Sequence, residues 1–248
     1  MGAPPFVLVP PSEGKAEGGR PGHKPGSFDD QLAAPRQAVA TAVRRLLDEG
    51  DNATWARVFK ARGDLLERAV SAWRTTLAGE APVLPAWRRY TGVVWGGLDP
   101  GSLSLAQRRR LLVPSAFYGI TTAEDPVVDY RLTFLVSLTG PGPLARYWQP
   151  MLTEALAARV GRRPVVDLLP AEHAGAIDWV RLGGRARICR VRFLAVDGQR
   201  AAGHAAKAAK GALARLVVDE GADAIASFGW EGWRAFADGD SWVVVAPS

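Results

Sequence analysis

The stretch at residues 111–134 constrains the fold of this chain more than any other. An apolar run at residues 111–113 leads into the turn 117–119, Phe-Tyr-Gly, and a second apolar run leaves toward residues 130–131. Glycine adopts a positive φ at little cost, so Gly119 suits a tight turn. The pattern therefore predicts a hairpin between two buried segments in the middle of the chain.

This hairpin is also a candidate anion site. A tight turn at Gly119 can orient several backbone N–H groups in one direction, which is how short hairpins bind phosphate. Tyr118, Tyr130 and Arg131 would then lie nearby as two phenols and a fixed cation. The alternative is structural, with Tyr118 and Tyr130 as core aromatics and Gly119 as a turn residue only.

Length and composition favour one ordered domain over residues 1–248. The chain has 48% apolar residues and nine tryptophans, enough for a sizeable core, and no internal repeat or flexible linker divides it. No window approaches the ~18 uninterrupted apolar residues of a membrane helix, and residues 1–11 lack the features of a signal peptide. We therefore expect a single α+β domain with a central sheet and a helical N-terminal half, no membrane association and a cytoplasmic location.

Cysteine and histidine usage argues against a disulfide or a metal site. Cys189 is the only cysteine and lies in an alternating, strand-like segment, so we expect a core thiol. His23, His173 and His204 have no spacing typical of a metal site, and the sequence has no Cys-x-x-Cys pair. We predict no structural metal and no cofactor.

Charge is unevenly distributed along the chain. The 31 Lys and Arg residues against 25 Asp and Glu give a formal net charge of +6, with basic residues in short clusters and an acidic C-terminal end. Such an excess favours phosphorylated or polyanionic partners through long-range attraction. A solvated basic surface is the alternative, because arginine and alanine enrichment also follows from GC-rich coding.

The N-terminal segment predicts a buried strand followed by a polar loop. Residues 5–10 form an apolar run, and Ser12 and Lys15 stand in the loop after it, a position where α/β sheets bind ligands. The loop is not a Walker A motif, because it lacks the upstream glycine and the Ser or Thr after the lysine. Ser12 and Lys15 match the Ser-x-x-Lys motif of penicillin-binding serine enzymes, but the partner motifs Ser-Asp-Asn and Lys-Thr-Gly are missing.

The remaining chain predicts helices mixed with strands. Asp197-Gly198 signals a hairpin with a short return strand. Periodicity and turn signals predict helices at residues 29–77 with a break at 50–51, at 104–110, 143–160, 171–180 and 203–218, and strands at 165–169, 188–196, 234–236 and 242–246.

Lys207 and Lys210 are three residues apart in the predicted helix at residues 203–218 and so share one face. Lys207 also lies near the N-terminal end of that helix, where the dipole favours anions. A lysine pair in solvent is the alternative interpretation. With Lys15 and Arg131, these two are the cations expected to converge on one cleft.

Several short motifs follow one another in a characteristic order. They are Leu8-Val-Pro-Pro-Ser-Glu-Gly-Lys15, Tyr90-Thr-Gly-Val-Val-Trp-Gly-Gly-Leu-Asp99, Phe117-Tyr-Gly119 with Tyr130-Arg-Leu132, Tyr147-Trp148, Val166-Asp-Leu168 with Glu172, and His204 with Lys207, Lys210 and Gly211. In this order and spacing they resemble the YaaA family of bacterial peroxide-stress proteins over nearly the whole chain.

The resemblance implies a compact mixed fold with a positively charged cleft, a helix-hairpin-helix-like element, a link to oxidative stress and an ability to bind DNA. The chain also departs from the family pattern, and the departures remove an arginine, a glutamate and two aromatic or amide groups that could touch a ligand. The departing positions are Thr122, Ala123, Asp129, Thr133, Phe134, Leu135, His173, Ala205 and Ala206.

The first functional hypothesis is a basic cleft that holds nucleic acid or another phosphate-bearing ligand through backbone contacts. Tyr90, Trp95 and Tyr118 would stack on unpaired bases. The expected anion-binding set is Ser12, Lys15, Tyr118, Gly119, Tyr130, Arg131, Lys207 and Lys210.

The second hypothesis is an enzyme of a specialised biosynthetic pathway that acts on a small anionic metabolite in the same cleft. Lys15, Lys207 or Lys210 would act as base or nucleophile, and Tyr90 or Tyr130 would pass a proton. Arg131 would clamp a carboxylate or phosphate. A third possibility is an interaction protein without a site, which predicts that Trp230 and Trp233 are exposed together.

Overall fold

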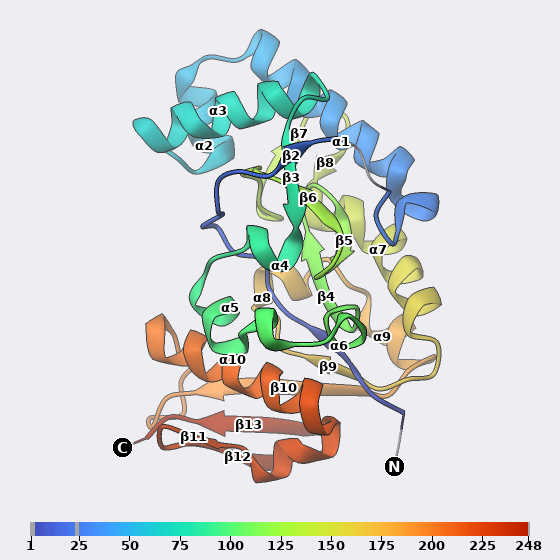
Figure 1. Ribbon diagram of the computed structural model, residues 1–248, viewed down its shortest axis with the longest axis vertical. Helices are drawn as coiled ribbons and strands as arrows, with labels where there is room; N and C mark the ends of the chain where they lie inside the picture. The colour runs from blue at the N-terminus through green and yellow to red at the C-terminus, as the bar shows by residue number, and fades with distance from the viewer. Residues whose placement is uncertain (1–2, 23–24, 248) are drawn as a thin grey trace.

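A computed structural model describes residues 3–22 and 25–247, and those residues form an eight-stranded central sheet (Figure 1). The inner five strands are parallel, and antiparallel strands lie at both edges. In spatial order the strands are β11 (Gly229–Trp230), β12 (Trp233–Asp238), β13 (Ser241–Val245), β10 (Ile188–Leu194), β9 (Val165–Asp167), β1 (Phe6–Leu8), β4 (Leu111–Ser115) and β5 (Gly119–Thr122).

Two smaller sheets lie beside the central one in the described chain. The first joins β2 (Arg20–Pro21), β3 (Pro82–Pro85) and β6 (Pro126–Val128). The second joins β7 (Ser137–Leu138) and β8 (Gly142–Pro143).

Helices gather at the two ends of the molecule and along one side. Figure 1 shows α1, α2 and α3 at one end and α10 against the strands at the other end. The helices are α1 (Asp29–Glu49), α2 (Asn52–Phe59), α3 (Asp64–Leu77), α4 (Ala86–Arg89), α5 (Val93–Leu98), α6 (Leu105–Arg108), α7 (Leu144–Val160), α8 (Ala171–Ala174), α9 (Trp179–Gly183) and α10 (Gly203–Glu220), with the 3-10 turns η1 (Pro100–Ser102) and η2 (Ala222–Ser227).

The α+β class, the helical N-terminal half and the central hairpin are confirmed. Strands β4 and β5 pair around the turn, and Ser115 lies opposite Gly119. Short helices α4 and α5 are joined by residues 90–92, and the helix-hairpin-helix-like element stays a prediction. Cys189 is buried, as expected of a core thiol. His23 lies outside the described residues.

Two local predictions were wrong. The segment 171–180 is not one helix, because Asp178 accepts hydrogen bonds from the amides of Val180 and Arg181 and so begins α9 separately from α8. The return after Asp197-Gly198 is only a single bridge between Leu194 and Arg200, not a strand.

Burial of the inner strands explains why their sequences are apolar throughout. Every residue of β1, β4 and β9 is buried, whereas β10 alternates between buried and exposed positions. Parallel strands covered on both faces need continuous apolar runs, and a half-covered strand needs alternation. No helix in the described part of the chain is long and apolar enough to cross a membrane; a cytoplasmic location stays a prediction.

The exposed tryptophan pair expected of an interaction protein is absent. Trp233 is buried, with its ring 6.1 Å from that of Phe193, while Trp230 is half-buried. The two tryptophans lie opposite each other in β11 and β12, and both pack against the hydrophobic core at this edge of the sheet.

The Gly119 turn is packed into the core. Gly119 has a φ of 76°, and a Cβ at this position would lie 2.6 Å from the Trp148 ring. The Trp148 indole N–H also donates to the carbonyl of Ala116 at 2.9 Å. Glycine is therefore required here both for its backbone conformation and for the close approach of α7.

Helices α5 and α10 cross at two glycines. A Cβ on Gly97 would lie 2.8 Å from the carbonyl oxygen of Ala208, and one on Gly211 would run into the carbonyl oxygen of Val94. The contact places α10, which carries Lys207 and Lys210, directly against α5. The glycine that follows Lys210 thus has a packing role.

A buried guanidinium ties the loop after β1 to the small sheet. Arg89 is 1% exposed and donates to the carbonyls of Val127, Ala16, Gly18 and Pro82. The Ala16 amide in turn donates to the carbonyl of Arg89 at 2.8 Å. This network fixes the backbone that follows Lys15.

We predict that Gly211→Ala lowers the free energy of unfolding by about 1–3 kcal/mol, because overpacking of a close helix crossing forces the backbones apart. Urea unfolding measures the change. Gly96→Ala is the matched control on α5, since a Cβ at Gly96 meets nothing within 4 Å. Equal effects of the two substitutions would contradict the packing role.

We predict that Arg89→Lys lowers the free energy of unfolding by about 2–3 kcal/mol, because a lysine cannot reach all four carbonyls and leaves buried acceptors unpaired. Arg88→Lys, at the exposed neighbouring position, is the control and should change stability little. Thermal unfolding of both variants provides the comparison, and an unaffected Arg89→Lys protein would refute the network.

Candidate functional site

The carboxyl ends of β1 and β9 mark the candidate site. These strands are adjacent and parallel, but the chain leaves β1 toward β4 on one side and leaves β9 toward β10 on the other. Loops that diverge in this way open a crevice beyond the strand ends, where α/β sheets bind ligands. Ser12 and Lys15 follow β1, and Glu172 and His173 follow β9.

Lys15 is held over two phenol rings. Its Nζ donates to the Ser12 carbonyl at 3.0 Å and lies 4.4 Å from the centre of the Tyr130 ring and 5.7 Å from that of Tyr90. Burial lowers the pKa of the Lys15 amine to about 8, opposed by the carboxylate of Asp129. Lys15 is thus a partly desolvated amine, neutral far more often than a lysine in water.

Three tyrosines form the floor beneath Lys15. The Tyr130 hydroxyl lies 2.7 Å from Ser115 Oγ and 3.1 Å from the Tyr90 hydroxyl, and the Tyr118 hydroxyl accepts from the Val128 amide. Burial raises the pKa of all three phenols, so they remain protonated.

The expected aromatic stacking platform does not exist. Tyr90, Trp95 and Tyr118 are 2%, 3% and 8% exposed, so their ring faces are inside the core. The prediction that these rings stack on unpaired bases is wrong, because the hydrophobic core takes up the faces that bases would need.

The Gly119 turn offers no amides to a phosphate. The amides of Phe117 and Tyr118 both donate to Ser115 Oγ, at 3.2 and 3.0 Å. The turn is also covered by Trp148. The Ser115 hydroxyl, which was not among the predicted site residues, therefore accepts the hydrogen bonds that an anion would need, and Gly119 has only the structural role.

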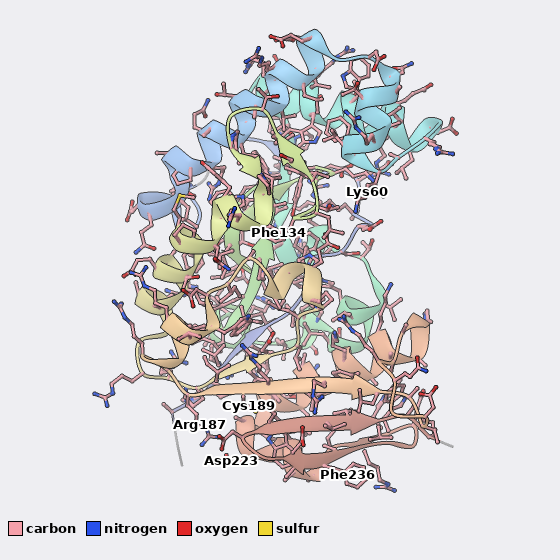
Figure 2. All side chains as sticks on the ribbon, turned by 180° about the vertical axis from the view of Figure 1, so that it is seen from behind. Lys60, Phe134, Arg187, Cys189, Asp223 and Phe236 are labelled. Carbon is pink, nitrogen blue, oxygen red and sulfur yellow. The ribbon has the colours of Figure 1, made fainter. Side chains whose placement is uncertain are left out.

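Arg131 caps the end of α2. Its Nε donates to the Phe59 carbonyl at 2.8 Å, and its Nη2 donates to the Lys60 carbonyl and to Glu13. Three residues further along the chain, Phe134 lies between Lys60 and β10 along the long axis of the molecule (Figure 2). No hydrogen bond joins Nη1 to a described residue, so the guanidinium is fixed on one side and open on the other.

Lys15 and Arg131 line one small hollow, here the Lys15 hollow, of about 60 Å³. Its lining includes the polar residues Ser12, Glu13, Lys15, Tyr130, Arg131, Glu172 and His173. Burial lowers the pKa of His173 to about 4, so the imidazole is neutral, and its Nδ1 is buried without a partner in the described chain.

Lys207 and Lys210 line a second, larger hollow, here the Lys210 hollow, of about 810 Å³. Its defining residues are Pro170, Arg192, Phe193, Arg200, Lys207 and Lys210. The Lys210 Nζ lies 5.3 Å from the centre of the Phe193 ring. Burial lowers the pKa of Lys210 to about 8, and the charge of Arg200 lowers it further. No carboxylate lines this hollow within the described chain.

Asp167 lies at the end of β9 beneath Lys210. The carboxylate is 7% exposed and accepts the Leu169 amide at 2.9 Å. Burial raises its pKa to about 6, and the charges of Arg190 and Lys210 oppose that rise. Asp167 and Arg200 were not among the site residues predicted from the sequence, although the position of Asp167 at the end of a buried strand was a usable signal.

The four predicted cations meet in two neighbouring hollows and not in one. Helix α8 separates the hollows: Pro170, Ala171 and Ala174 line the Lys210 hollow, while Glu172 and His173 line the Lys15 hollow. The charge of Lys210 contributes to the low pKa of His173, so the hollows are electrostatically coupled. Among the described residues no group of three His, Cys, Asp or Glu side chains has the arrangement of a metal site.

Comparison with known proteins places the chain in a family. Residues 6–238 match the family model described as "Peroxide stress protein YaaA". A UPF0246 protein of Streptomyces coelicolor is 34% identical over 87% of this chain and 84% of its own length. A UPF0246 protein of Corynebacterium efficiens is 31% identical over 86% of this chain and 84% of its own length. On the combined evidence of these matches, the chain belongs to the YaaA family of peroxide stress proteins.

Proposed function

We propose that this protein binds a phosphate-bearing ligand, with nucleic acid as the class that the family resemblance implies, in the Lys210 hollow. The observation that carries the proposal is the charge of the lining: four cations, an apolar floor and no carboxylate among the described lining residues. The side chains of Arg200, Lys207 and Lys210 make no hydrogen bond or ion pair with a described residue, whereas Arg192 pairs with Asp238. Unpaired cations over a partly apolar surface suit a phosphate group.

Binding of nucleic acid at this hollow would depend on phosphates and not on bases. The aromatic rings first considered for base stacking lie inside the core, so the contacts left for a strand are electrostatic. Such contacts carry no sequence information and weaken as salt rises. The volume of about 810 Å³ also suits a nucleotide-sized ligand, within the usual range of small-molecule sites.

A second candidate function, an enzyme acting on a small anionic metabolite, is favoured by the chemistry of the Lys15 hollow. An amine whose pKa is lowered to about 8 lies beside a fixed arginine and a neutral histidine. Perturbed groups that face one hollow at a strand-end crevice are typical of reactive sites.

We predict that the double variant Lys207→Ala/Lys210→Ala weakens binding of single-stranded DNA, duplex DNA and nucleotides together. Each lost phosphate contact should reduce the slope of log affinity against log salt by about 0.7 on single strands and about 0.9 on duplex. Salt-dependent binding titrations of all three ligands measure both effects.

The matched control is Arg45→Ala/Arg57→Ala, which removes the same charge from exposed positions in α1 and α2. It should leave affinity and salt slope close to those of the unaltered protein. If both double variants weaken binding equally, the interaction is general charge attraction and the proposed hollow is not the site. Melting temperatures of the variants separate loss of binding from loss of structure.

We predict that affinity for a DNA oligonucleotide falls about tenfold between pH 7 and 9. Only the protonated amine attracts the phosphate, and a lysine with a pKa of about 8 goes from about nine-tenths to one-tenth protonated over this interval. The phosphodiester does not titrate there. Lys210→Arg keeps its charge and should flatten the profile; an equally steep profile in this variant would show that another group is responsible.

A further inference from the structure

We propose that Lys15 forms imines with small carbonyl compounds that carry one carboxylate, such as two- or three-carbon oxo acids, and that Arg131 holds the carboxylate. This activity deepens the enzyme candidate and rests on it. It can fail without excluding phosphate binding in the Lys210 hollow, because the two hollows are lined by different cations.

The position of the amine suits attack on a carbonyl carbon. Lys15 lines the hollow, and its Nζ is anchored by donation to the Ser12 carbonyl while it lies over the Tyr130 ring. A neutral amine keeps a hydrogen for that donation and still has its lone pair. The anchoring bond therefore orients the nucleophile without consuming it.

The surroundings keep a large share of the amine neutral near physiological pH. Burial lowers the pKa of Lys15 to about 8; Asp129 and Glu13 oppose this, while Arg131 and Arg89 add to it. At pH 7.5 about a quarter of such an amine is neutral, against roughly a thousandth of an ordinary lysine.

The other titratable groups around the amine hold one protonation state over the same pH range. His173 has its pKa lowered to about 4 by burial, and the phenols of Tyr90 and Tyr130 have theirs raised, so these groups stay neutral between pH 6 and 9. A change in reactivity over that range is therefore assigned to Lys15.

Size and charge select the substrate class. The hollow of about 60 Å³ has room for a molecule of a few non-hydrogen atoms. Arg131 is fixed through Nε and Nη2, and its Nη1 makes no hydrogen bond with a described residue, which leaves it open to a carboxylate. Glu13 and Glu172 also line the hollow and repel a second negative charge. With one open arginine nitrogen to attract an anion and two carboxylates to repel additional charge, the hollow suits a monocarboxylate better than a dicarboxylate or a phosphate ester.

The step is a condensation without redox change. The Lys15 nitrogen forms a bond to the carbonyl carbon, the π electrons move to the oxygen, and one proton passes from nitrogen to oxygen to give a carbinolamine. The nitrogen lone pair then forms the C=N bond, the hydroxyl leaves, and a second proton from nitrogen completes a water molecule. Amine and carbonyl compound thus give imine and water.

The test is reductive trapping with pyruvate and cyanoborohydride, followed by peptide mass spectrometry. We expect the reduced adduct on Lys15 to form at least about tenfold faster than on the exposed Lys60, as the larger neutral fraction of Lys15 predicts. Labelling of Lys15 should rise from pH 6.5 to 8.5. Lys15→Arg keeps the positive charge and should remove this adduct while leaving DNA binding unchanged.

Carboxylate recognition is tested separately on the unaltered protein. Acetate should slow trapping by pyruvate by competing for Arg131, whereas chloride at equal ionic strength should not. Acetaldehyde, which has no carboxylate, should label Lys15 more slowly than pyruvate. Labelling of Lys15 no faster than that of Lys60 would overturn imine formation, and an equal response to acetate and chloride would overturn the role of Arg131. Neither result bears on phosphate binding in the Lys210 hollow.

Discussion

The buried guanidinium of Arg89 is the interaction on which the candidate site depends. Four backbone carbonyls, from the loop after β1, from β3 and from β6, accept hydrogen bonds from this guanidinium. Leaving any of these carbonyls unpaired in the interior would lower the free energy of unfolding. Because Ala16 and Gly18 are among the acceptors, the loop that carries Lys15 cannot move away from the sheet. The buried side chain of Arg89 therefore sets the position of the Lys15 amine.

Desolvation has the same effect on two lysines, but their neighbours give them different chemistry. Burial is the main reason that the pKa of both Lys15 and Lys210 is lowered to about 8. Lys15 is surrounded by phenols, two nearby carboxylates and the two fixed arginines Arg131 and Arg89, which suits a reactive amine. Lys210 lies among further cations with Asp167 beneath it, which suits the capture of an anion. Helix α8 keeps these two environments apart.

Departures from the family pattern fall close to these hollows. Asp129, one of the positions where the resemblance implies a different residue, pairs with Arg68 at 2.8 Å and raises the pKa of Lys15. His173, another such position, contributes a neutral imidazole against Phe134, with ring centres 5.6 Å apart. His173 lines the Lys15 hollow, whereas Asp129 acts on Lys15 through its charge from outside that lining. Ala206, another of the departing positions, lines the Lys210 hollow, so each hollow has a departing position in its lining.

The sequence by itself determined the elements and their class. Continuous apolar runs predicted β1, β4 and β9, Gly119 predicted the hairpin turn, and ordered motifs predicted the family. These features could be predicted because hydrophobic periodicity and the backbone conformations that a residue can adopt are local properties of the sequence. Only the tertiary structure decided which polar groups remain free. Ser115 uses the turn amides, the core hides Tyr90, Trp95 and Tyr118, and α8 divides four expected cations between two hollows. Burial and hydrogen-bond pairing between distant segments have no signature in local spacing, so the chemistry of the site emerged only with the fold.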